Sequence, residues 1–185
     1  SGEAMLFNNM GSACLVSGDF YQASKHCEQA ARIFAELNEP IPHGLALINR
    51  AEAHRELGQY GLSRELSGQT LALLRTSGFR RGEAVVLENL GLVEHALGHL
   101  EQALQVTAQA MAIAHEIGSR ALEASTLHHL GVIHTAAGDY AQAQQALEAA
   151  SELVRELGTE RPALEVHGAL AQLALARGGD EWHRQ

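Results

Sequence analysis

The chain has 185 residues, of which 46% are hydrophobic and 19% charged, and its formal charge is −9. This apolar content is too high for a disordered tail and indicates one folded unit. The acidic charge, with no basic run longer than Arg80-Arg81, disfavours direct binding to nucleic acids. No apolar stretch approaches the roughly 20 residues that span a bilayer, so we expect no membrane partner and a soluble, cytoplasmic protein.

A repeat of 40 residues organises the whole chain. Short segments that begin with glycine recur at this spacing: Gly18-Asp19-Phe20, Gly58-Gln59-Tyr60, Gly98-His99-Leu100 and Gly138-Asp139-Tyr140, and Gly178 continues the series. A second column has residue types that end helices in the left-handed conformation: Asn38, Gly78, Gly118 and Gly158. Each unit is therefore predicted to be a first helix, a tight turn, a second helix and a short loop.

In chain order, the predicted repeats cover residues 3–40, 41–80, 81–120 and 121–160, followed by a capping helix at 161–178 and a tail at 179–185. In the third unit the first helix is predicted at 82–97 and the second at 101–117; in the fourth unit they are predicted at 122–137 and 141–157. The other units follow by subtracting 40. The last helix should begin near Pro162 and end near Arg177. The predicted fold class is all-α.

The repeat resembles a known family. The segment Asn89-Leu90-Gly91, the spacing from Gly98 to Ala103, and Ala110 are similar to a tetratricopeptide repeat. That unit has about 34 residues, and the longer unit here resembles the branch found in kinesin light chains, Pins-type polarity adaptors, bacterial signalling ATPases and antibiotic-cluster regulators. The resemblance implies a right-handed superhelical solenoid whose first helices line the concave side. One column departs from the family's bulky aromatic: Cys14, His54, Glu94 and His134.

The candidate binding residues lie on first helices. One column contains Asn9, Asn49, Asn89 and His129, and in the long-repeat relatives such a ladder clamps the backbone amides of an extended peptide. An asparagine amide suits this role because it both donates and accepts hydrogen bonds. Neighbouring candidates are Asn8, Ile48, Glu88, His128, Glu52, Arg55, Leu92 and His95. The alternative is that the asparagines only hydrogen-bond neighbouring helices, as buried polar groups must.

Three functions remain open from the sequence. The first is a protein-interaction module that binds an extended segment of a partner or of its own chain, within a larger bacterial regulatory or signalling protein. The second is the effector-sensing domain of a bacterial transcription regulator, with polar contacts from His128, His129, Glu88 and His95. The third is self-association through the last helix, where leucines are expected to be exposed: Leu164, Leu170, Leu173 and Leu175.

Catalytic and metal-binding motifs do not occur in the sequence. The chain has 11 histidines, but no His-Glu-x-x-His or Cys-x-x-Cys pair, and adjacent His128 and His129 would point about 100° apart on a helix. Neither a phosphate-binding loop nor a Gly-x-Ser-x-Gly elbow is present. Cys14 and Cys27 are the only thiols and are expected to be core residues. We therefore expect no metal, no cofactor and no enzymatic activity.

Overall fold

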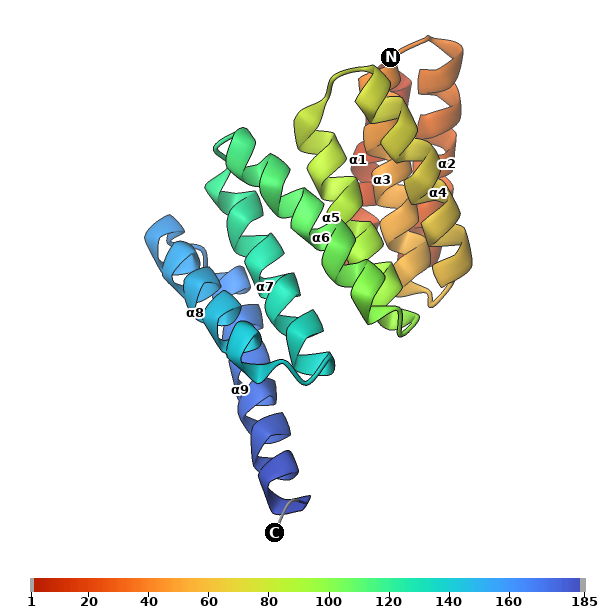
Figure 1. Cartoon of the computed structure of the whole chain (residues 1–185). Coiled ribbons are helices and arrows are strands. Elements are labelled where there is room, and N and C mark those ends of the chain that lie inside the picture. The colour runs from red at the N-terminus through yellow and green to blue at the C-terminus, as the bar shows by residue number, and fades with distance from the viewer. Residues whose placement is uncertain (1, 184–185) are drawn as a thin grey trace.

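Nine α-helices make up the part of the chain that the computed structural model describes, which is residues 2–183 without the side chains of residues 161 and 179–183. They are α1 (Gly2–Ser17), α2 (Phe20–Glu36), α3 (Pro40–Glu56), α4 (Tyr60–Thr76), α5 (Arg80–Ala96), α6 (Leu100–Glu116), α7 (Arg120–Ala136), α8 (Tyr140–Leu157) and α9 (Glu160–His183). Each helix packs against the next, so four hairpins follow one another and α9 comes last (Figure 1). The prediction of an all-helical array of hairpins is confirmed.

The turns between helices use the predicted glycine and asparagine columns. Asn38 and seven glycines, at positions 18, 58, 78, 98, 118, 138 and 158, have φ between 54° and 80°. In the turn after α5, the Gly98 N–H donates to the His95 carbonyl at 2.9 Å, and the His99 N–H donates to the Glu94 carbonyl at 2.9 Å. These bonds satisfy carbonyls that the end of a helix leaves open, and residues that tolerate positive φ permit them.

Some helix ends differ from the prediction. First helices begin earlier than expected, at Pro40, Arg80 and Arg120. The last helix runs through Gly178 to His183 instead of ending near Arg177. A glycine inside a helix costs only about 1 kcal/mol relative to alanine, so Gly178 does not terminate α9. Residues 184–185 of the predicted tail lie outside the described residues.

Small residues bring the two helices of each hairpin into contact. A Cβ atom built on Gly11 would lie 2.3 Å from Cys27 Sγ, and one built on Gly131 would lie 2.4 Å from Leu147 Cγ. There is no room for a methyl group at either position. Second helices contribute alanines that are completely buried, among them Ala30, Ala110 and Ala150. The hairpins then bury larger side chains such as Leu87 and Leu153 against their neighbours, which stabilises the stack.

Within its described side chains, between residues 162 and 178, the last helix buries apolar residues on one side only. Val166, Ala169 and Leu173 are buried in clusters with residues of α7 and α8, and Leu170 packs against the same clusters. The expectation that Leu170 and Leu173 are exposed is therefore wrong, because they lie on the core-facing side of α9. Leu164 and Leu175 are on the other side and are 74% and 77% exposed.

Candidate binding surface

Odd-numbered helices form the inner layer of the array. The pairs α1–α3, α3–α5, α5–α7 and α7–α9 are in contact, whereas no two even-numbered helices contact each other anywhere in residues 2–183. A stack that is more closely spaced on one side curves toward that side. The free side of the odd-numbered layer is therefore concave, and we call it the concave surface.

The second member of the asparagine ladder makes a hydrogen bond between helices. Asn49 Nδ2 donates to Asn8 Oδ1 at 3.2 Å, which joins α3 to α1. Both side chains are half-buried, while Asn9 is exposed. Of the first two members of the column, Asn9 is therefore the more accessible to a ligand.

The next member of the ladder is buried. Asn89 is only 9% exposed. Its Oδ1 accepts from Arg55 Nε at 3.0 Å, and its Nδ2 donates to Ser67 Oγ at 3.4 Å. Both functions of the amide are thus used inside the protein, as the alternative interpretation of the column expected. Ile48, on the same face of the preceding helix, is 7% exposed and packs in the core.

The fourth member pairs with a carboxylate. His129 Nδ1 lies 3.0 Å from Glu88 Oε1, which joins α7 to α5. The rings of His128 and His129 are 5.2 Å apart. Burial, followed by the charge of His129, lowers the pKa values of both His95 and His128. Both side chains therefore favour their neutral form on the concave surface.

The remaining candidates are partly accessible. Glu52, Leu92 and Arg55 are half-buried, and Arg55 also lies 2.6 Å from Glu56. Two apolar side chains that precede the asparagines by one turn are exposed: Met5 (57%) and Leu45 (40%). The concave surface thus offers apolar and polar groups beside each other along its length.

A pocket of about 190 Å³ lies between α7, α8 and α9. Ala124, Val154 and Val166 form apolar walls, and Ser125 and His128 supply polar groups. The sequence interpretation missed this pocket. Its signal is a loss of side-chain volume between positions that are 40 residues apart: Ser125 corresponds to Val85, and Pro162 corresponds to Leu122. Val85 and Leu122 pack in one core cluster between the third and fourth units.

Two members of the column that departs from the family's aromatic are buried and make internal polar contacts. Glu94 is fully buried and its oxygens lie 2.7 Å from Arg64 Nε and 2.8 Å from His99 Nδ1. One unit earlier, His54 is 7% exposed and lies 2.6 Å from Gln59. In both cases one of the partners is the residue after the turn glycine. These buried polar side chains therefore connect first helices to their turns.

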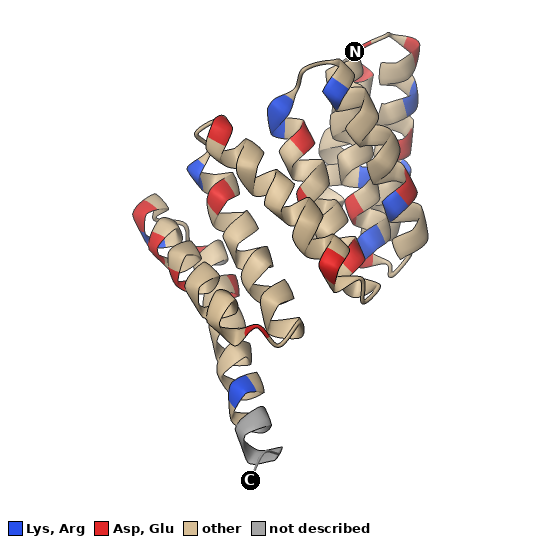
Figure 2. Cartoon of the chain, viewed as in Figure 1, with Lys and Arg blue, Asp and Glu red and all other residues tan. Residues whose placement is uncertain are grey.

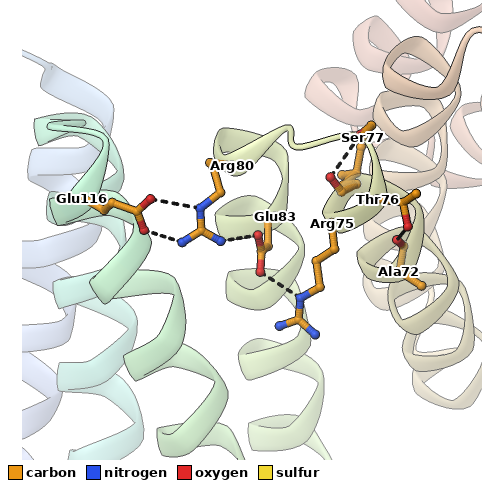
Figure 3. Close-up of polar contacts among 8 residues, drawn as sticks. Ala72, Arg75, Thr76, Ser77, Arg80, Glu83 and Glu116 are labelled. Atoms are coloured by element: carbon orange, nitrogen blue, oxygen red, sulfur yellow. Dashed lines mark hydrogen bonds and ion pairs between the residues drawn. The ribbon is translucent and has the colours of Figure 1, made fainter.

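An ion-pair chain crosses one edge of the array. Charged residues of α6 and α7 lie only toward the helix ends (Figure 2). Arg75 Nε lies 2.8 Å from Glu83, which also binds Arg80, and Arg80 in turn binds Glu116 (Figure 3). One unit later the corresponding residues make the corresponding contacts: His115, Glu123, Arg120 and Glu156. These contacts link successive helices.

Metal-binding clusters and membrane-spanning helices are both absent from the described residues. No group of three or more His, Cys, Asp or Glu side chains is placed to hold a metal ion. None of the described helices is both long and apolar enough to cross a membrane.

Comparison with known proteins identifies the repeat. Models of the tetratricopeptide repeat match residues 43–116 and 124–163. None of the curated proteins compared with the chain matches it. Among solved structures, aspartyl phosphate phosphatase F from Bacillus subtilis is similar with a TM-score of 0.83 and 16% identity, over 97% of this chain and 47% of that one.

Two other structures share the fold. A Rap protein complexed with competence and sporulation factor has a TM-score of 0.83 at 15% identity, over 95% of this chain and 51% of that one. The tetratricopeptide-like repeats of a Podosopora anserina kinesin light chain have a TM-score of 0.72 at 19% identity, over 100% of this chain and 92% of that one. The chain thus spans about half the length of the phosphatase and the Rap protein. With its two family matches and this architecture, the chain belongs to the tetratricopeptide-repeat family.

Proposed function

We propose that this protein-interaction array binds an extended segment of a partner protein along its concave surface, without catalysing a reaction, as part of a larger bacterial regulator. The observation that carries the proposal is the strip of accessible side chains on successive odd-numbered helices. Met5 and Leu45 supply apolar area, and Asn9 supplies an amide that can pair with a peptide backbone.

The ladder members that already make internal hydrogen bonds restrict where pairing with a peptide backbone occurs. Asn89 has both amide functions occupied by Arg55 and Ser67, and Asn49 donates to Asn8. Replacing these bonds with ligand contacts would return little net free energy, because one hydrogen bond is exchanged for another. The proposed segment therefore pairs with Asn9 and packs on the apolar positions, and the amides deeper in the array keep the helices in register.

The pocket between α7 and α9 favours a side chain over a free effector. Its volume of about 190 Å³ is below the roughly 300–1,000 Å³ of typical small-molecule sites. Apolar walls formed by Ala124, Val154 and Val166 suit one aliphatic side chain of the bound segment. His128 beside these walls can hydrogen-bond the adjoining backbone. A small effector is the second candidate, and the same pocket with His128 is the observation in its favour.

Two further considerations support the proposal. The −9 charge of the chain favours neutral or basic segments and opposes nucleic acids. A protein of the same fold has been crystallised with competence and sporulation factor bound, which supports ligand recognition by such arrays.

The test is a selection of random displayed peptides on the protein, followed by binding measurements with variants of matched exposure. Leu45→Arg alters the concave surface, whereas Leu62→Arg alters α4, and the two leucines are equally exposed at 40%. Selected peptides should lose at least tenfold in affinity for the first variant and keep their affinity for the second. Equal binding to both variants would place the site elsewhere.

A third variant separates the two candidates for the pocket. Ser125→Leu restores the larger side chain that the preceding unit has at Val85 and fills the pocket. This variant should weaken the binding of peptides that carry an aliphatic side chain, and it should not change the binding of their alanine-substituted forms. If no peptide is selected while N-acetyl-leucinamide shifts the NMR signals of Ala124 and His128, the pocket instead takes a small molecule.

A further inference from the structure

The free side of α9 carries a narrow stripe of four residues, Leu164, Gly168, Ala171 and Leu175. Their spacing of four, three and four residues places them on one face of a helix. All four are exposed, the leucines by 74% and 77%. The stripe is on the opposite side of α9 from the buried residues Val166 and Leu173.

The internal repeat shows what normally covers this stripe. Positions 40 residues earlier on α7 are Ala124, His128, Gly131 and Thr135, and each is buried or half-buried. Gly131 is in direct contact with Leu147 of the second helix of its own hairpin. The stripe on α9 therefore corresponds to a face that packs against an antiparallel helix in the preceding unit.

A second helix of the usual kind does not fit this stripe. The equivalents of Leu164 are Ala4, Gly44, Ala84 and Ala124, all buried. At Gly44 even a Cβ atom would lie 2.4 Å from Leu74. A leucine at this position therefore needs a covering helix that is further away at this end and close only near Gly168 and Ala171.

The stripe itself has this complementary shape. In chain order its residues are large, small, small and large, and its midpoint lies halfway between Gly168 and Ala171. When two copies of α9 pair in antiparallel fashion about this midpoint, Leu164 lies opposite Leu175 of the second copy and Gly168 lies opposite Ala171 of the second copy. The small residues allow close approach at the centre, and the leucines fill the wider ends.

Charge does not oppose this pairing. None of the four stripe residues is charged. Glu165 borders the stripe, and its counterpart in the second copy would be offset by nine positions, which is about 13 Å along the helix axis. Repulsion over that distance between exposed groups is largely screened at physiological ionic strength.

From these observations we propose that the protein forms a two-fold symmetric dimer through antiparallel packing of α9 on α9 of a second copy. The dimer contact involves α9 alone, so the concave surface of α1, α3, α5 and α7 remains open in both copies. Dimerisation through α9 requires no partner segment on the concave surface.

The dimer is tested by light scattering coupled to size-exclusion chromatography over a wide concentration range. The protein should reach twice the 19.8 kDa of one chain. The double variant Leu164→Glu/Leu175→Glu should remain at one chain mass with unchanged helicity, since both leucines are exposed. Leu6→Glu is the matched control, because Leu6 is a 59% exposed leucine on the open face of α1, and it should still dimerise.

A cross-linking experiment tests the orientation. Chains with Leu164→Cys are mixed with chains with Leu175→Cys and oxidised. The antiparallel dimer predicts a mixed disulfide and little symmetric product, because the two copies of position 164 would be about 16 Å apart along the axis. A monomer at all concentrations overturns the proposal. So does a dimer that is abolished by Leu6→Glu, which indicates end-to-end stacking, or a dominant symmetric disulfide, which indicates parallel helices.

Discussion

Arg64→Ala should destabilise the protein, because it removes an ion-pair partner of the buried Glu94 carboxylate. The carboxylate is fully buried, and Arg64 Nε lies 2.7 Å from one oxygen while His99 Nδ1 lies 2.8 Å from the other. Removing one partner of a buried ion pair costs about 3–5 kcal/mol. The Arg64 side chain is 45% exposed, so solvent screening reduces this, and we expect roughly 1.5–2.5 kcal/mol for Arg64→Ala.

Thermal unfolding followed by circular dichroism measures this loss. For a chain of this size the expected decrease in Tm is roughly 3–10 °C. Adding Glu94→Gln to Arg64→Ala should recover more than half of the loss, because the orphaned charge is removed while a group that can bond His99 stays. Arg32→Ala is the control, since its pair with Glu36 is 4.0 Å long and exposed on both sides and should contribute little. A double variant that is no more stable than Arg64→Ala would refute the reasoning.

Three other predictions concern stability and reactivity. Gly131→Ala should destabilise the protein by about 1–2 kcal/mol in urea unfolding, because the new Cβ would lie 2.4 Å from a leucine side chain. Gly68→Ala is the control, because position 68 has open space around it, and it should stabilise the protein by up to about 1 kcal/mol. Burial, and then a neighbouring histidine, lower the pKa of His128 from 6.5. As the pH drops below about 6.5, the unfolded chain therefore takes up a proton before the folded chain does, and the free energy of unfolding should fall. Urea midpoints measured against pH should show this decrease, and His128→Gln should make it smaller. Burial raises the pKa of Cys27 to about 12, so mass spectrometry should find iodoacetamide on the half-buried Cys14 and find Cys27 alkylated only in urea.

Features that depend on local geometry were accessible from the sequence. Gly98 and Asn38 end helices because few other residues adopt positive φ easily. Gly131 indicates a close helix contact because only a residue without a side chain fits beside Leu147. Such signals need no knowledge of distant residues, and they fixed the number and order of the hairpins.

Features that depend on particular distant partners were not accessible. Whether Asn89 faces a ligand or the interior depends on Arg55 and Ser67, which precede it by 34 and 22 residues. The column alone allowed both outcomes. The pocket near Ser125 had a readable signal in the loss of side-chain volume, but that signal has meaning only once α7 and α9 are known to be in contact.

Among the described residues, all contacts between helices join segments that are close in the sequence. Every contacting pair consists of successive helices or of odd-numbered neighbours in adjacent units, so among the described residues no contact joins helices that are more than one unit apart. Loop closure is therefore inexpensive at each step, and folding can begin at any hairpin and spread in both directions. In evolution, a whole unit can be gained or lost while every other unit keeps its own neighbours, and the length of such an array can change without redesign of its core.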